Sequence, residues 1–452
     1  MKPYRWILLS LTGALLAALP ITAAPEDEAL AESDRVDELE RKVDLLTDEL
    51  ARTRQEMGVP EEKQELESVW GLGPAASKVY GLSRGLSIGG YAEAFGTAIV
   101  HDKKDTTERN RFDALRAVLY AGYKFTDHIV FNSEIEFEHG TTNTTESSGG
   151  GSVSVEFAAL DFLLRDELNV RGGLLLVPMG FINEMHEPPF FYGVNRPVVE
   201  QAIIPTTWRH GGAGLFGRVA DVIEYKLYAV TSFNAAGFDD SGLRGGRQQG
   251  NRELAEDIAF VGRVDIEPIP ELLVGGSVFV GETGQDQEVV NADGVLIDFP
   301  QSRLILWEAH SELNAIGFRG RVLFTMAHVD DAGELTLALR PSPVGSSEIA
   351  AGEAVASDML GAYGEVGYDV MRWIAPDSGW TVEPFFRYEY VDTQHAMPRG
   401  FSEDKTNKLY IYTAGISAKP IPNVVLKIDY RNRDAREGQG ADEVNLGFGL
   451  VF

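Results

Sequence analysis

The ten residues EVNLGFGLVF (443–452) carry an apolar side chain at every second position. Between the apolar residues lie Asn445, Gly447 and Gly449. A period of two is typical of a β-strand that has one apolar face, because successive side chains of a strand point to opposite sides. We therefore expect a strand here, with Asn445 and the two glycines on its other face.

The same alternation recurs along most of the chain. Sixteen segments of 11 to 16 residues show it, at 86–100, 110–125, 128–139, 153–164, 167–177, 209–219, 222–232, 256–267, 271–283, 303–315, 317–329, 358–370, 379–391, 408–419, 423–434 and 442–452. The sequence predicts an all-β protein with sixteen antiparallel strands.

The connections between these strands alternate strictly between short and long. The short connections are FTDHI, RDE, VADV, EPIPE, NAIG, PIPN and a slightly longer turn at 372–378. The long polar connections lie at 101–109, 140–152, 178–208, 233–255, 284–302, 330–357, 392–407 and 435–441. An even-stranded outer-membrane barrel has short periplasmic turns and long external loops, so the alternation predicts a transmembrane β-barrel.

Charged residues occupy one face of these strands. In 128–139, Ile135 and Phe137 share one parity and Glu134 and Glu136 the other. In a membrane barrel the apolar face contacts lipid and the charges point into the lumen. This rule predicts the lumen-lining residues Arg171, Arg263, Arg319, Arg321, Arg387, Lys427, Arg431, Glu134, Glu136, Glu308 and Glu312. The predicted lumen is mixed in charge.

Composition excludes several other classes. The net charge of −29 argues against a nucleic-acid partner, and the absence of Cys excludes thiolate metal sites and disulfides. GLSRG (81–85) and GLSIG (85–89) match the G-x-S-x-G elbow, but the second continues as strand instead of turning into a helix. We therefore expect no enzyme activity, no cofactor and no metal.

The first 85 residues are organised differently. Residues 1–23 have a basic start, an apolar stretch and a small-residue end, typical of a secretory signal peptide. Val36, Leu39, Val43 and Leu46 fall on heptad positions, which predicts a periplasmic coiled-coil helix over 24–68. Residues 69–85 are expected to form a linker into a barrel spanning 86–452. This order places the protein in a Gram-negative outer membrane, with the helix in the periplasm.

The third long loop has an unusual composition. Between 178 and 208 it combines five prolines with several aromatics, which is neither a disordered linker nor a solvated loop. Such a loop is expected to fold into the lumen, where its polar groups would narrow the pore and face permeating ions. The expected constriction residues are Asn183, Glu184, His186, Glu187, Arg196, Glu200, Arg209 and His210. The alternative is that the loop packs against a neighbouring subunit.

Several of these stretches resemble a known family. They are LGPAASKVY (72–80), GLSIGGYAE (85–93) and the third-loop motifs VPMG, EPPFFYGVNRP and IIPTTWR, followed by GAGLFG (212–217). These stretches are similar to sequences of the porins grouped with the phosphate-selective O and P type. The resemblance implies a trimeric sixteen-stranded barrel, an inward-folded third loop and a frequent amino-terminal coiled coil. It also implies a lysine-rich anion constriction, whereas the third loop here contains no Lys.

Together these patterns predict an outer-membrane porin for passive diffusion of small polar solutes or ions, embedded in lipid as a homotrimer. The alternatives are a phosphate-like anion channel and a structural tether that links the membrane to the periplasmic cell wall through the coiled coil. A surface hydrolase using Ser83 or Ser87 is a further alternative. Phe452 is expected to serve as the terminal aromatic by which barrels are recognised for assembly, or simply as a lipid-facing aromatic.

Overall fold

The computed structural model describes residues 38, 41–43, 45, 48, 49, 66–101, 109–144, 150–290, 295–339, 354–436 and 440–452. They belong to two compact units, Met1–Glu65 and Leu66–Phe452. In the first unit the described residues are helical and exposed, and Lys42 Nζ lies 2.7 Å from Glu38 Oε1. The predicted signal peptide and most of the predicted coiled coil lie outside the described residues. None of the helices described is long and apolar enough to cross a membrane.

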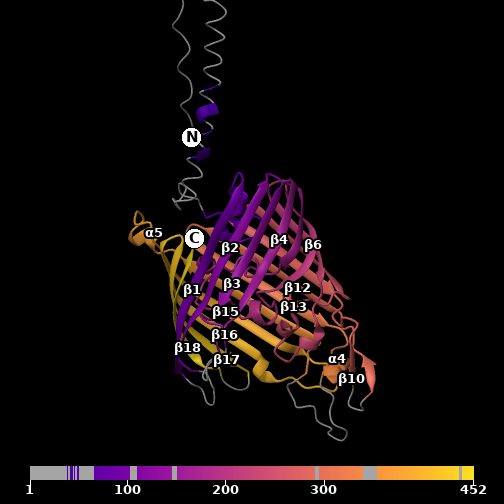
Figure 1. The fold of residues 1–452 in the computed structure, drawn as a ribbon. Helices are drawn as coiled ribbons and strands as arrows, with labels where there is room; N and C mark the ends of the chain where they lie inside the picture. Colours follow the sequence, from indigo (N-terminus) through magenta and orange to yellow (C-terminus); the bar gives the residue numbers. More distant parts are fainter. Residues whose placement is uncertain are drawn as a thin grey trace, which may run out of the picture. The chain divides into compact units, whose positions relative to one another are not determined.

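The second unit is a closed antiparallel barrel of sixteen strands (Figure 1). Its strands are β1 (Gly85–His101), β2 (Arg111–Thr126), β3 (Ile129–Glu138), β4 (Val153–Arg165), β5 (Leu168–Leu176), β6 (Arg209–Val219), β7 (Ile223–Thr231), β8 (Ile258–Ile269), β9 (Leu272–Gly281), β12 (Leu304–Ala315), β13 (Phe318–Val329), β14 (Asp358–Tyr368), β15 (Thr381–Ala396), β16 (Lys408–Ile421), β17 (Val424–Ala435) and β18 (Asp442–Val451). Each of the sixteen predicted segments overlaps one of them, so the predicted sixteen-stranded antiparallel barrel is confirmed.

Two details differ from the prediction. Strand β15 continues to Ala396, because Thr393 Oγ1 and Gln394 Nε2 donate to carbonyls of Asp240 and Ala354 in neighbouring loops. A small hairpin of β10 (Glu288–Val290) and β11 (Leu296–Asp298) lies in the long polar connection predicted at 284–302, for which no strand is predicted. Both features depend on contacts between distant segments, which periodicity does not reveal.

The two ends of the barrel differ. Six of the connections at one end, here called the turn end, are two or three residues long, and the seventh, between β14 and β15, contains the short helix α5 (Met371–Ile374). The long connections all leave the opposite loop end, near α4 (Ala332–Leu339) in Figure 1.

Strand β18 closes the barrel against β1. Val451 pairs with Tyr91, and Phe452 exchanges two backbone hydrogen bonds with Gly90, at 2.9 and 3.0 Å. Every strand edge of the barrel is therefore paired, as the alternation in 443–452 predicts.

The faces of the strands are inverted relative to a water-soluble barrel. Outward apolar side chains such as Val322 and Leu446 are 56% and 63% exposed, whereas the inward Asn445 is fully buried. The predicted parity of 128–139 and of 442–452 is confirmed.

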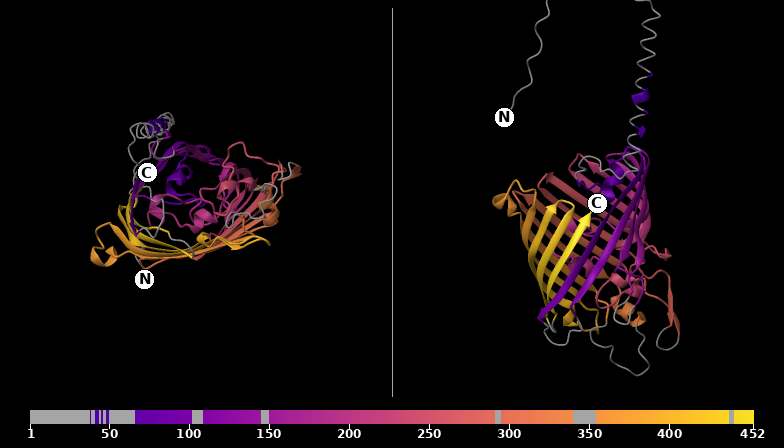
Figure 2. Two further views of the ribbon diagram at one scale, coloured as in Figure 1. Left: turned by 90° about the horizontal axis from the view of Figure 1, so that it is seen from below. Right: turned by 60° about the vertical axis from the view of Figure 1, so that its left-hand side comes forward.

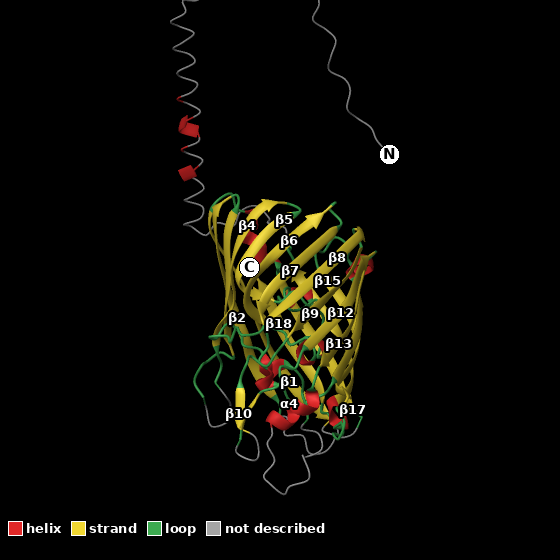
Figure 3. Ribbon diagram, turned by 90° about the vertical axis from the view of Figure 1, so that its right-hand side faces the viewer, coloured by secondary structure: helices red, strands yellow, loops and turns green. Residues whose placement is uncertain are grey.

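Much of the interior is filled by loops, as the view along the barrel in Figure 2 and the helices near the loop end in Figure 3 show. Buried apolar side chains of these loops pack on the inner faces of β5 to β9 and β12 to β14. Short helices interrupt the loops at η2 (Ala235–Gly237), η3 (Arg244–Gly246), η4 (Lys405–Asn407) and α4.

The predicted linker over 69–85 is wrong. Residues 74–81 form the helix α2 (Pro74–Gly81), which begins with Pro at its first position and lies inside the barrel. Its carbonyl at Ala75 approaches the inward Gly89, and Val79 packs on the inward Gly122. Residues 66–68, the last of the predicted coiled-coil segment, are not helical.

Candidate pore constriction

Residues 177–208, here called the constriction loop, leave β5 and return to β6 inside the barrel. We divide the loop into a base (177–183 and 198–208) and a tip (184–197). The base is largely apolar, with fully or almost fully buried side chains at Val177, Met179, Ile182, Val199, Ile203, Ile204 and Trp208. The short helix α3 (Val199–Ala202) belongs to it, whereas η1 (Pro188–Phe190) belongs to the tip.

Asn183 joins the two segments of the base by hydrogen bonds. Its Nδ2 donates to Val177 O at 2.6 Å and to Trp208 O at 2.8 Å, and its Oδ1 accepts from Trp208 N at 2.7 Å. The predicted constriction residue Asn183 therefore fixes the geometry of the loop and does not face the pore.

Inward cations of the barrel wall hold the tip by its carbonyl groups. Arg321 and Arg319 both donate to Phe190 O, and Lys427 Nζ donates to Phe191 O at 3.0 Å. Arg387 donates to Tyr192 O at 3.1 Å and to Asn195 O at 2.9 Å.

Inward carboxylates hold the same segment by its amide groups. Asp429 accepts from Val194 N at 2.6 Å. Glu389 accepts from Val198 N at 2.5 Å and from Val199 N at 3.3 Å, where α3 begins. An irregular, proline-rich backbone buried in a lumen cannot satisfy its own polar groups, and an unpaired buried amide or carbonyl is costly. The wall charges supply these partners.

Three predicted constriction residues of the tip are buried in specific pairs. Glu184 Oε2 lies 2.7 Å from Lys226 Nζ, and His186 Nε2 lies 3.0 Å from Glu134 Oε1. Glu187 Oε1 accepts from Ala75 N at 3.0 Å and from Ala76 N at 3.4 Å, at the start of α2.

The other predicted constriction residues are also buried. Glu200 accepts from Ile182 N at 2.8 Å and from Tyr363 Oη at 2.6 Å, and Arg209 pairs with Glu156 at 2.6 Å. His210 lies 3.1 Å from Glu253 in the loop after β7. The expectation that these side chains face permeating ions is wrong for the paired groups, because the composition of the loop indicates burial in the lumen but not the partner of each side chain.

Arg196 is different. Its side chain is 9% exposed and donates to His186 O at 3.4 Å, and no carboxylate among the described residues lies within ion-pair distance of it.

The predicted lumen-lining residues all lie on inward faces, but most are paired. Arg171 binds Asp161 at 2.7 Å, and Arg431 binds Glu443 at 2.7 Å. Further pairs are Arg263 with Asp265, Glu308 with His310, Glu136 with Arg116, Glu312 with Arg319 and Arg321, and Arg387 with Glu365 and Glu389.

A few inward charges remain open to solvent. The side chains of Arg319 and Glu312 are 13% and 22% exposed, that of Lys419 is 18% exposed and that of Arg433 is 27% exposed. All four lie on β12 to β17. They mark the side of the lumen where a solute could pass the tip.

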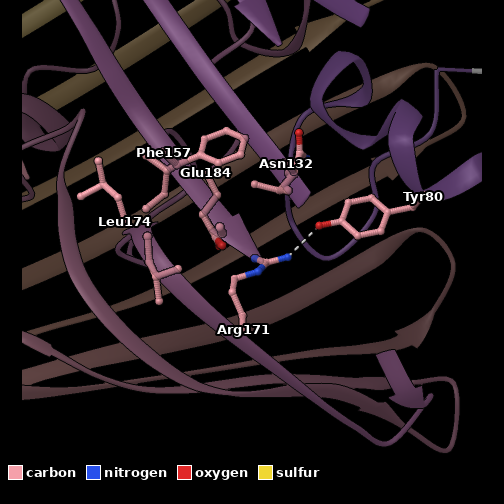
Figure 4. Close-up of a pocket in the computed structure, with 10 residues that line it drawn as sticks. Tyr80, Asn132, Phe157, Arg171, Leu174 and Glu184 are labelled. Atoms are coloured by element: carbon pink, nitrogen blue, oxygen red, sulfur yellow. Dashed lines mark hydrogen bonds between the residues drawn. The ribbon is translucent and has the colours of Figure 1, made fainter. Parts of the chain in front are cut away.

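The helix α2 is tied to both the wall and the tip. Tyr80 Oη donates to Asp161 at 2.6 Å. It also accepts from Arg171 Nη2 at 3.0 Å (Figure 4). Asn132 Nδ2 donates to Ala76 O at 2.8 Å. A cavity of about 10 Å3 between these groups and Glu184 is at the lower limit for one water molecule.

The inward glycines of 443–452 leave the space in which the tip packs against the barrel wall. A Cβ on Gly449 would lie 2.3 Å from Pro188 Cβ, and one on Gly447 would lie 3.4 Å from Val194 Cγ1. The alternation in the sequence indicates that these glycines face inward, and the structure adds that the tip fills the space they leave.

Sequence reasoning missed four residues that hold the loop and α2, namely Lys226, Glu389, Tyr363 and Tyr80. Lys226 and Glu389 share the inward parity of Tyr228 and Arg387 on their own strands, which could have identified them. No pattern marks Tyr80, because its helix was taken as linker.

Comparisons with known proteins place this geometry in a family. No protein-family model matches the chain. Over 385 residues the chain is 35% identical to an uncharacterized protein of Aquifex aeolicus (strain VF5), and the match covers 84% of this chain and 83% of that protein. The chain belongs to the family of this Aquifex protein. Members of this family are thus expected to share the barrel and its constriction loop.

Solved porins have the same fold. OmpF of Salmonella typhi, solved in complex with daunomycin, superposes with a TM-score of 0.51 at 13% identity, covering 82% of this chain and 98% of that one. The anion-selective porin from Comamonas acidovorans gives a TM-score of 0.48 at 10% identity, covering 82% and 100%. The likeness to OmpF shows that the barrel of this family has the porin fold.

Proposed function

We propose that this protein is an outer-membrane porin, a channel for passive diffusion of small polar solutes or ions. The observation that carries the proposal is the inverted barrel, with exposed apolar side chains outside and charged groups inside. A sixteen-stranded barrel is wide enough to leave an aqueous passage. The tip of the constriction loop narrows this passage, and no reaction is catalysed.

Conductance in a planar lipid bilayer tests this proposal. The purified protein should produce discrete steps whose current is proportional to voltage. Insertion into the bilayer without any conductance would contradict the channel and favour a purely structural role.

A second candidate is a channel that prefers anions, including phosphate, as the resemblance to the phosphate-selective O and P type porins implies. On the inner faces of β12 to β17, the partly exposed cations Arg319, Lys419 and Arg433 outnumber the partly exposed carboxylate Glu312, which favours this candidate. An excess of fixed positive charge attracts anions. The reversal potential under a salt gradient separates the candidates: a value near zero supports general diffusion, and a strongly anion-directed value supports the second candidate. Lys419→Glu should move the potential toward cations.

The arrangement around the barrel is also proposed. Residues 1–23 would direct export, 24–68 would form a coiled-coil helix in the periplasm, and the barrel would assemble as a homotrimer in the outer membrane. A trimeric form is among the solved structures with a similar fold. Phe452 would act as the assembly signal, so Phe452→Asp should impair insertion far more than it alters the conductance of inserted molecules.

A further inference from the structure

One connection at the turn end departs from all the others. Residues 369–380 join β14 to β15 and contain α5, whereas the other six turns have two or three residues. In Figures 1 and 2 this connection projects outward from the barrel wall.

The projection is strongly apolar. Among the described residues, the four most exposed large apolar side chains are Ile316 at 79%, Trp373 at 77%, Phe112 at 75% and Ile374 at 73%. Three of the four lie on this connection or on the adjacent turn 316–317. Concentrated exposed apolar surface of this kind marks a contact with a partner or a membrane.

The surface is held in a fixed shape. The rings of Phe318 and Tyr368, on the outer wall, lie 4.6 Å apart, and the rings of Tyr368 and Trp373 lie 4.8 Å apart. Asp369 Oδ1 accepts from Met371 N at 3.1 Å and from Val382 N at 3.2 Å, which fixes the start of α5.

Arg372 joins the two turns. Gly317 has a φ of +89°, and a Cβ there would lie 2.5 Å from Arg372 Cδ. The arginine stem therefore packs over this glycine while the side chain remains exposed. We call Ile316, Phe318, Tyr368, Arg372, Trp373 and Ile374 the paddle.

We propose that the paddle binds phospholipid head groups of the periplasmic leaflet, an inference that rests on the proposed membrane location of the barrel. The paddle continues the outward apolar face, where Val366 and Phe386 are each 47% exposed. Tryptophan is favoured at the boundary between head groups and acyl chains, and an exposed guanidinium can bind lipid phosphate. A second copy of the chain, as in the proposed homotrimer, is the competing occupant, and the quenching experiment separates it from lipid.

Tryptophan quenching by brominated lipids tests the paddle. The chain from residue 24 carries five tryptophans, of which Trp208 is fully buried and Trp70 packs on Phe216 inside the barrel. With Trp307→Phe and Trp380→Phe, Trp373 becomes the tryptophan that can meet lipid. The protein is refolded into phosphatidylethanolamine and phosphatidylglycerol vesicles with bromine either near the head group or near the chain end.

The matched control carries Trp373→Phe and Trp380→Phe and keeps Trp307, which lies on the outer wall of β12. Quenching of Trp307 reports that the barrel is in the bilayer. We expect quenching of Trp373 as well, stronger for bromine near the head group than for bromine near the chain end.

Two results would overturn the inference while leaving the porin proposal intact. Trp307 could be quenched while Trp373 is not and emits as in water, which means that the paddle projects into the periplasm. Alternatively, unquenched Trp373 could emit at short wavelength and shift only when the oligomer is dissociated in detergent, which means that a second copy covers it. Absence of quenching at Trp307 would overturn the membrane location and this inference together.

Discussion

The base and the tip of the constriction loop are buried to the same degree, but different interactions hold them in place. The base packs Ile203, Trp208 and their neighbours into an apolar cluster shared with the loops after β7 and β13. The tip also buries Phe191, Tyr192 and Val194, but outside this cluster. Charges of β13, β15 and β17 bind its backbone. Apolar burial tolerates small displacements, whereas hydrogen bonds to fixed wall charges specify one position. The base therefore supplies stability and the tip supplies a defined width.

The largest effect is expected from Arg387→Ala, which removes the main anchor of the tip. Arg387 is fully buried, pairs with Glu389 at 3.0 Å and Glu365 at 3.5 Å, and donates to two tip carbonyls. Its loss leaves the buried Glu389 without its cation and Glu365 with the longer pair to Arg321 at 4.0 Å. The free energy of unfolding should therefore fall by roughly 3–5 kcal/mol. Urea unfolding in vesicles measures this value.

The control for this variant is Arg303→Ala, which removes a pair with Glu282 on the exposed loop end. It should leave both unfolding and conductance unchanged. Equal behaviour of the two variants would mean that Arg387 does not hold the tip.

Ile203→Ala tests the base. The side chain is fully buried, and its removal should lower the free energy of unfolding by about 2–5 kcal/mol because a cavity remains. Conductance should change little, since the tip keeps its own anchors. The control is Ile416→Ala on the outer face, where the side chain is 44% exposed. It should lower the free energy of unfolding by less than Ile203→Ala does. If Ile203→Ala changed the conductance as much as Arg387→Ala does, the distinction between base and tip would be lost.

Gly449→Ala tests how closely the tip fits the wall. The new Cβ would lie 2.3 Å from Pro188 Cβ, so the tip must shift, at a cost of about 1–3 kcal/mol. Single-channel recordings should show an altered conductance. Gly96→Ala is the matched control, because its Cβ meets nothing closer than 3.7 Å, and an unchanged conductance in both variants would contradict the fit.

The smallest effect is expected from Glu253→Gln, at the end of the base. Although burial alone would raise it, hydrogen bonds from His210 and Thr231 lower the pKa of Glu253 to about 2. Because this pKa is depressed on folding, the stabilisation is present above the unfolded value of about 4.3 and is lost only as the pH falls through about 2. Glu253→Gln should reduce stability by roughly 1–2 kcal/mol at neutral pH. Unfolding measured between pH 3 and 7 should show this difference, and wild-type stability lost near pH 5 would contradict the assignment.

The sequence predicts the barrel well because a lipid-facing and a lumen-facing side leave a period of two in every strand. It also predicts the inward course of the constriction loop, since Phe191, Tyr192 and Trp208 need burial. It could not predict that Arg387 and Lys427 bind the loop backbone, because parity fixes the direction of a side chain and not what lies opposite. Helix α2 is not predicted because the glycines and proline of 71–74 are typical of a loop, although Pro at the first helical position favours a helix start.

Single-channel conductance after removal of the tip tests the central claim most directly. Residues 188–195 would be replaced by a short Gly-Ser segment, with folding checked by resistance to unfolding in detergent on unheated gels. If the charge-held tip sets the width of a diffusion channel, the variant should conduct clearly more than the wild type in the same salt. Equal conductance of a folded variant, or a wild type that inserts without conducting, would contradict the account.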